Sequence, residues 1–244
     1  MCGIVCYVGE AEARPVLLEG LKRLEYRGYD SAGIAVQNSR NIHCCRAVGK
    51  IAQLERKLNG TPLAGVAGIA HTRWATHGAP SEKNAHPHTD QHGDVFVVHN
   101  GIIENYLVIK KALEKQGISL QSETDTEVLA HLIGLNFDGH LDQAVMNTMA
   151  QVEGSFGLAV IHRRVRGEIV VARRGSPLII GVGRDGHIAA SDVAAMLKHT
   201  NQVIHLRDNE VATLHTDGLS ISTVQAEPIL RQAEPVDWQA ADAE

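Results

Sequence analysis

Short apolar runs of strand type recur along most of the chain, and this recurrence is the feature that most limits how it can fold. The runs lie at residues 2–8, 33–36, 42–48, 68–72, 95–99, 156–161, 168–172, 178–182, 187–190 and 210–214. Apolar residues at helical spacing mark few stretches, at residues 16–24, 102–113 and 124–133. A regular alternation of strand and helix is therefore disfavoured, and the pattern predicts an α+β fold. From residue 155 onward we expect mainly scaffold.

Charge and hydropathy argue against two classes of partner. The chain has 23 Lys and Arg residues against 28 Asp and Glu residues, a net charge of −5, and no basic block, which disfavours nucleic acid. No apolar run approaches the ~20 residues that cross a membrane. The first ten residues lack the basic flank of a secretory signal and turn acidic at Glu10. We expect a soluble, cytoplasmic protein.

The four cysteines, at positions 2, 6, 44 and 45, are too few and too unevenly spaced for a disulfide scaffold. Three of them lie in strand-type runs, where reduced thiols pack as small apolar groups. Cys2 differs, because removal of Met1 would leave a thiol and a free α-amine on one residue. Such an amine titrates at roughly 7.7–8.0 and a thiol at about 8.5, so nucleophile and base would need no separate histidine. A Met-Cys start alone remains weak evidence of catalysis.

Acyl transfer at such a thiol also needs hydrogen-bond donors for the oxyanion that forms on the attacked carbonyl. Asn100 and Gly101 directly follow the run at residues 95–99 and offer a side-chain amide and an accessible backbone N–H. The same dipeptide is the commonest hairpin turn, so without other signals a turn is favoured.

The densest polar group is HTRWATHG, at residues 71–78. In it Arg73 offers bidentate recognition of a carboxylate, Thr76 a hydroxyl contact, and Trp74 a flat cover over a ligand. Asp125, in the first turn of a predicted helix, would supply the opposite charge for a ligand with both a carboxylate and an ammonium. Each charge also has an ordinary role, Arg73 in a surface ion pair and Asp125 at a helix N-terminus.

Histidines at positions 86, 88 and 92 raise the question of a metal site. The chain has 14 histidines, and no carboxylate or cysteine stands at a familiar zinc spacing beside these three. We therefore expect no metal ion and no cofactor.

Six motifs, taken together and in order, closely resemble the glutaminase domains of the glutamine–fructose-6-phosphate aminotransferase (isomerizing) family, the glucosamine-6-phosphate synthases. The motifs are CGIV from residue 2, LEYRGYDSAG from 24, HTRWATHG from 71, NAHPH from 84, VVHNGIIEN from 97 and SETDTEV from 122. The resemblance covers nearly the whole chain. It implies an N-terminal-nucleophile hydrolase fold, a four-layer αββα sandwich in which two antiparallel sheets lie between helical layers.

The resemblance also implies hydrolysis of the side-chain amide of L-glutamine through a γ-glutamyl thioester. Cys2 would be the nucleophile, with its own α-amine as base, and Asn100 and the Gly101 N–H would form the oxyanion hole. The residues that would hold the amino-acid end of glutamine are Arg73, Thr76, His77 and Asp125. Those implied around the site are Trp74 as a gate, Arg27 and Gly28 in a covering loop, and His86 in support.

The resemblance implies a larger enzyme as well. The glutaminase domain is expected at residues 1–225, and residues 226–244 are expected to begin a linker to a sugar-isomerase domain. That domain would bind fructose 6-phosphate and use the ammonia to form glucosamine 6-phosphate, and the full-length chain would be a homodimer.

Two alternatives stay open. One is an amidotransferase of the same fold from the purine or asparagine branch, against which the motif LEYRGYDSAG favours the hexosamine branch. The other is a non-catalytic regulatory module for thiol or metal binding, which would use Cys2, Cys6 and the histidines without turnover. A retained Met1 would favour the module, because the α-amine would then belong to the wrong residue.

Overall fold

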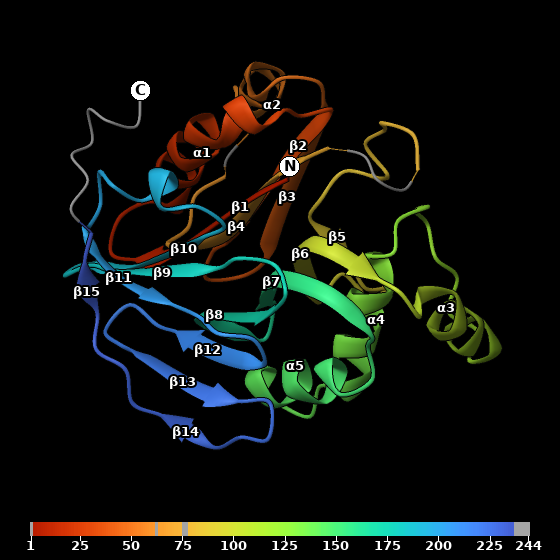
Figure 1. Ribbon diagram of the computed structural model, residues 1–244. Coiled ribbons are helices and arrows are strands. Elements are labelled where there is room, and N and C mark those ends of the chain that lie inside the picture. The colour runs from red at the N-terminus through yellow and green to blue at the C-terminus, as the bar shows by residue number, and fades with distance from the viewer. Residues whose placement is uncertain (1, 62, 75–77, 237–244) are drawn as a thin grey trace.

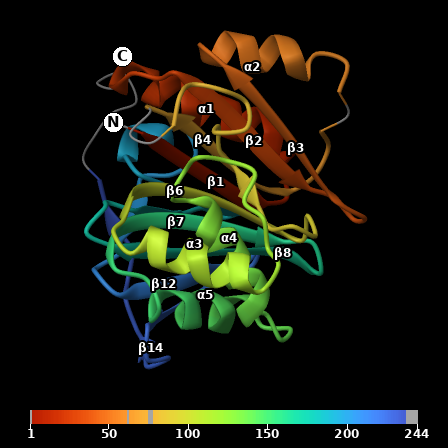
Figure 2. The ribbon, with the colours of Figure 1, turned by 90° about the vertical axis from the view of Figure 1, so that its right-hand side faces the viewer.

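The computed structural model describes residues 2–61, 63–74 and 78–236. Two antiparallel β-sheets lie face to face, and helices cover the outer face of each (Figure 1). In the turned view the layers follow one another from the helices α1 and α2 through both sheets to the helices α4 and α5 (Figure 2). This arrangement is the predicted αββα sandwich.

The first sheet contains the beginning of the chain. Its strands, in spatial order, are β15 (Glu234–Pro235), β11 (Gln202–His205), β9 (Ile179–Val182), β10 (Gly186–Ala190), β1 (Gly3–Gly9), β4 (Ala67–Arg73), β2 (Ser31–Gln37) and β3 (Ile42–Val48). Helices α1 (Ala13–Leu24) and α2 (Ile51–Leu58) bury an apolar stripe on its outer face, where Leu17, Leu21 and Leu54 pack against Ile34.

The second sheet has the order β14 (Pro228–Ile229), β13 (Leu219–Thr223), β12 (Glu210–Leu214), β8 (Val165–Arg174), β7 (Gly154–His162), β6 (Val95–Ile103) and β5 (His88–Thr89). Its outer face packs on α4 (Glu127–Asn136) and α5 (Leu141–Met149), and α3 (Tyr106–Lys115) contacts α4. No helix in the described ranges is long and apolar enough to cross a membrane.

A third apolar layer fills the space between the sheets. Along β1, Ile4 and Cys6 point into this layer while Val5 and Tyr7 point to the helices, as alternation along a strand requires. All seven residues of β1 are buried, because both faces of the sheet are covered.

Several boundaries differ from the sequence prediction. Ile102 belongs to β6 and not to a helix, since it continues the pairing with β7 opposite Ser155. The predicted helix at residue 124 begins at Glu127. Helices α2 and α5 were not predicted. The domain boundary at residue 225 remains a prediction, although β14 and β15 already lie beyond it.

Candidate active site

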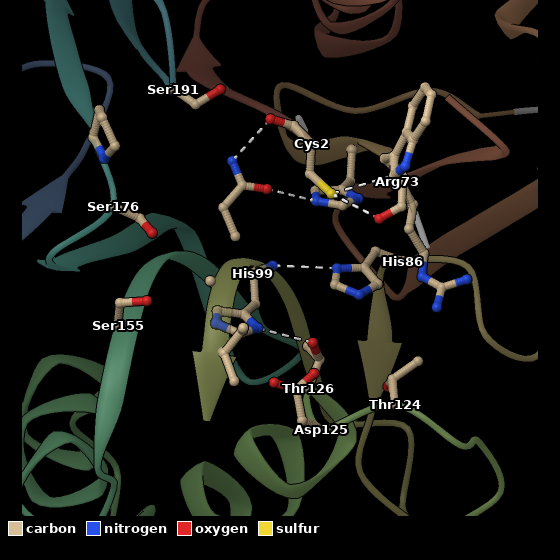
Figure 3. Close-up of a pocket in the computed structure, with 16 residues that line it drawn as sticks. Cys2, Arg73, His86, His99, Thr124, Asp125, Thr126, Ser155, Ser176 and Ser191 are labelled. Atoms are coloured by element: carbon tan, nitrogen blue, oxygen red, sulfur yellow. Dashed lines mark hydrogen bonds between the residues drawn. The ribbon is translucent and has the colours of Figure 1, made fainter. Parts of the chain in front are cut away.

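A cavity of about 540 Å³ lies where three strands meet (Figure 3). Because β1 and β4 are antiparallel, with Gly3 opposite Thr72, the start of β1 and the end of β4 lie together. The polar end of β6 reaches the same place from the second sheet. The sequence-predicted residues that line this cavity are Cys2, Arg73, Trp74, His86, Asn100, Gly101 and Asp125.

Cys2 stands directly before β1, and its thiol lies beside the end of β4. The Sγ atom accepts a hydrogen bond from the Trp74 N–H at 3.2 Å and lies 3.5 Å from the Trp74 carbonyl oxygen. Burial raises the pKa of the Cys2 thiol, and the Trp74 N–H only partly opposes this. The sulfur is therefore protonated at neutral pH and needs a base before it can attack.

Asn100 and Gly101 lie within β6, opposite Gly157 and Phe156, so the interpretation of this dipeptide as a hairpin turn was wrong. The Asn100 Nδ2 atom donates to the backbone carbonyl of Cys2 at 3.2 Å. Gly101 has φ +131°, and a Cβ there would lie 2.0 Å from the Ser155 carbonyl oxygen. Only glycine fits this position, which places its backbone at the cavity.

Arg73 and Asp125 bring opposite charges to the cavity wall. Arg73 is 4% exposed, so it is no surface ion pair: its guanidinium lies 3.7 Å from Asp30 and donates to the Gly78 carbonyl at 3.2 Å. Asp125 is buried in the turn before α4, where its Oδ2 atom accepts the Ile103 N–H at 2.8 Å. Buried charges of opposite sign around one cavity suit a zwitterionic ligand.

The remaining predicted residues lie at the rim or outside the described part. Trp74 is 54% exposed. Its ring lies against Gly28, whose φ is +88° and where a Cβ would come within 2.0 Å of the ring. Arg27 ends the short helix η1 (Glu25–Arg27). Thr76 and His77 lie outside the described residues, and so does Met1.

A group of buried histidines surrounds the site, and sequence reasoning singled out only one of them for it. The rings of His71 and His86 stack at 4.2 Å between centroids, and His88 meets His86 edge-on at 4.8 Å. The His86 Nδ1 atom accepts the backbone N–H of His99 at 3.3 Å. Burial lowers the pKa of His71 and of His88 to about 3 and that of His86 well below its usual value, so these rings are neutral. The sequence signal that could have assigned these histidines to the site was their position near the polar ends of strands.

These histidines also hold the segment that contains Asp125. The ring of His88 bonds the hydroxyl of Thr124 at 3.0 Å. The ring of His99 bonds the hydroxyl of Thr126 at 2.9 Å (Figure 3). Asp125 is thus fixed on both sides by its neighbours. Among the described residues, no group of His, Cys, Asp or Glu is arranged to hold a metal ion.

Serines of the C-terminal half form another wall of the cavity, so the expectation that this half is mainly scaffold was incomplete. Ser155, Ser176 and Ser191 all line it. The Ser191 hydroxyl accepts the Ile4 N–H at 3.1 Å and thereby holds the start of β1. No local sequence pattern marks these residues, because they reach the site only through the pairing of distant strands.

Comparison with known proteins agrees with this arrangement. The family model described as "Glutamine amidotransferase domain" matches residues 71–198. The glutamine–fructose-6-phosphate aminotransferases (isomerizing) of Thermus thermophilus and Aquifex aeolicus are 48% and 46% identical over 244 residues, all of this chain and 40% and 41% of theirs. The chain thus spans about 40% of the length of these relatives.

A solved structure supports the fold. The glutamine phosphoribosylpyrophosphate amidotransferase from B. subtilis, complexed with ADP and GMP, superposes with a TM-score of 0.80 and 26% identity. The match covers 91% of this chain and 49% of that one. The predicted fold class and the resemblance stated from the sequence are both confirmed.

Proposed function

The chain belongs to the family of glutamine amidotransferase domains, and from this premise we propose that it hydrolyses the side-chain amide of L-glutamine at Cys2. One observation carries the proposal: the Cys2 thiol and the Asn100 amide meet at a cavity that also offers the buried charges of Arg73 and Asp125. A thiol, an oxyanion donor and a clamp for an amino acid are the parts that this reaction needs.

Removal of Met1 precedes the reaction and frees the α-amine of Cys2 as the general base. The amine takes the thiol proton, the sulfur attacks the amide carbon, and the carbonyl oxygen becomes an oxyanion. Asn100 Nδ2 carries two hydrogens, so it can hold the Cys2 carbonyl with one and donate to the oxyanion with the other, beside the Gly101 N–H. The base returns its proton to the leaving ammonia, and a γ-glutamyl thioester forms. Water then attacks the thioester, which releases glutamate and restores the thiol.

The clamp fixes which end of glutamine enters. Arg73 holds the α-carboxylate and Asp125 the α-ammonium, with Thr76 and His77 completing the contacts. Trp74 serves as the gate for the ammonia, Arg27 and Gly28 form part of the covering loop, and His86 supports the site.

We propose further that this chain works as the ammonia-supplying part of a larger hexosamine-forming enzyme. The names of the relatives and the 40% of their length that it spans support this. In that enzyme residues 1–225 form the glutaminase domain, residues 226–244 begin the linker, and a sugar-isomerase domain binds fructose 6-phosphate. The full-length protein is a cytoplasmic homodimer.

The test is the variant Cys2→Ala, assayed for release of glutamate from glutamine. We expect a fall on the order of 10⁴-fold or more, because the nucleophile is lost while the binding groups remain. Cys44→Ala, which removes a thiol of β3 outside the cavity, is the control and should keep full activity. Unchanged glutamate release by Cys2→Ala would end the proposal.

Mass spectrometry separates this function from that of a regulatory module. The expected mature chain begins at Cys2 and is labelled there by one equivalent of a glutamine-like electrophile. A retained Met1, with bound zinc and no labelling, would support the module instead.

A further inference from the structure

His71 is a buried imidazole at the candidate site to which the proposed reaction assigns no step. It lies near the end of β4, is 1% exposed, and lines the cavity. Alternation along the strands explains its direction: Ile69 of β4 and Val98 of β6 both point into the layer between the sheets, so His71 and Asn100, two residues further along each strand, do too. The His71 Nε2 and Asn100 Oδ1 atoms are 2.9 Å apart.

We propose that His71 is a positioning residue, whose Nε2–H holds the Asn100 side chain so that its amide N–H groups, and not its oxygen, face the reacting carbonyl. The inference rests on the proposed glutaminase function and adds to it the group that orients the oxyanion donor.

The two hydrogen-bond partners of the Asn100 side-chain amide fix its orientation. A side-chain amide has a donor end and an acceptor end, and it can rotate to exchange them. The Cys2 carbonyl oxygen can only accept, and it lies 3.2 Å from the Nδ2 end of Asn100. The Oδ1 end therefore faces His71, and since this oxygen can only accept, His71 must present a hydrogen on Nε2.

The other tautomer of His71 would destabilise this arrangement. A neutral His71 with its hydrogen on Nδ1 would point the Nε2 lone pair at Oδ1. Rotation of the amide would relieve this contact but would bring Oδ1 against the Cys2 carbonyl oxygen. Both arrangements leave buried acceptors opposed, and the rotated amide also removes the donor from the oxyanion.

Stacking on a second histidine keeps the His71 ring in place. His86 stacks on it at 4.2 Å, and His86 is itself fixed through its Nδ1 atom by the His99 N–H. The imidazole stack thus holds the His71 ring in place, and that ring holds Asn100.

A double-mutant cycle of His71 and Asn100 in the natural protein tests the inference. The quantity measured is kcat for glutamine hydrolysis. Loss of an oxyanion donor costs about 10²–10³-fold, so Asn100→Ala should fall in that range. His71→Leu should lower kcat by about 10- to 100-fold, because the donor remains but is misoriented, and KM should stay within about threefold. Because His71 acts through Asn100, the double variant should be no slower than Asn100→Ala alone. Additive losses would overturn the inference.

Two further variants separate positioning from packing. His71→Gln keeps a side-chain N–H that can reach Asn100, so it should recover most of the kcat lost in His71→Leu. His162→Leu removes an equally buried imidazole from β7, outside the cavity, and should leave kcat unchanged. Equal losses in His71→Gln and His71→Leu would contradict the proposed role.

A measurement on the unaltered protein covers the case in which His71→Leu does not fold. The ¹⁵N shifts of the His71 ring at pH 7 should show a neutral imidazole with its hydrogen on Nε2. A hydrogen on Nδ1 would overturn the inference. This readout does not depend on turnover, so it tests His71 even if Cys2→Ala were to contradict the glutaminase function.

Discussion

Two cavities of nearly equal volume differ in how the chain builds them. The one at Cys2 has about 540 Å³, and one beside the β9–β10 hairpin has about 570 Å³. Apart from Tyr7 and Ala11, the second is lined by only two continuous segments, residues 182–188 and 199–202. The first collects Cys2, which stands before β1, and side chains from β4, β6, the turn before α4 and the serines of the C-terminal half. Convergence of distant segments, and not volume, distinguishes the candidate site.

The polar groups of the two cavities also differ in solvation. Arg184, Asp185 and His199 of the second cavity are exposed, so water satisfies them, whereas His187 there is buried. Arg73, Asp125 and the histidines of the first are buried, and each needs partners that the fold must supply. A fold that maintains so many buried polar groups in one place loses stability there, which is typical of a functional site.

The largest expected difference in kcat is between two variants in which one asparagine of each cavity is replaced by aspartate. Asn100→Asp keeps the shape of the side chain but replaces the N–H donor with an acceptor that faces the Cys2 carbonyl. We expect kcat for glutamine hydrolysis to fall by at least about 10²-fold, as for loss of an oxyanion donor. Asn201→Asp in the second cavity is the matched control and should leave kcat unchanged. Equal rates for the two variants would remove the basis of the comparison.

A smaller effect is expected when the clamp loses a charge. Asp125→Asn keeps an oxygen that can accept the Ile103 N–H, but it cannot neutralise an ammonium group. A hydrogen bond to a charged group contributes about 1.5–3 kcal/mol, so KM for glutamine should rise about 10- to 100-fold with a lesser change in kcat. Asp185→Asn removes the same charge from the second cavity, and steady-state kinetics should give it the KM of the parent. A parental KM in Asp125→Asn would show that Asp125 does not hold the substrate.

The sequence allowed the strands of the sandwich to be predicted more accurately than the features of its site. Alternation and apolar runs are local, and ten strands lie close to their predicted positions. Ile102 was misplaced in a helix because its spacing with Tyr106 and Ile109 is helical, whereas its pairing with Ser155 depends on a strand more than fifty residues away. The same limit affected Asn100 and Gly101, which read locally as a turn.

The site residues that sequence reasoning missed have the same explanation. His71 and His99 acquire a role only when β4 and β6 face each other across the two sheets. The serine wall depends on β7, β10 and the segment before β9 reaching the cavity together. The charges of Arg73 and Asp125 suggested their roles and the family resemblance implied the same roles, but only the structure shows that both side chains are buried.

The histidines of the first cavity predict how stability depends on pH. In the folded protein the pKa of His71 and of His88 lies at about 3, against about 6.5 in an unfolded chain. Between these values the unfolded state binds more protons, so the free energy of unfolding falls as the pH drops from 6.5 towards 3. At pH 5 each ring accounts for a loss of about 2 kcal/mol.

Urea denaturation of the parent and of His88→Gln, at pH 7 and at pH 5, measures this contribution. The variant is less stable at pH 7, because the hydrogen bond to Thr124 changes. Its free energy of unfolding should, however, fall by about 2 kcal/mol less than that of the parent between pH 7 and pH 5. An unchanged loss would mean that His88 titrates normally in the folded protein and that the first cavity is more hydrated than its burial indicates.

The smallest effect is expected for His199, the exposed histidine of the second cavity. His199 is exposed, and its ring centroid lies 6.5 Å from that of Tyr7, near the outer limit of the range for aromatic pairs. His199→Asn should change the free energy of unfolding at pH 7 by no more than about 0.5 kcal/mol, as surface substitutions usually do, and should leave glutamate release unchanged. A fall in glutamate release with stability intact would mean that the second cavity is coupled to the first. Since β1 pairs with β10 and directly follows Cys2, that coupling would run along β1, and the two cavities would then be parts of one system.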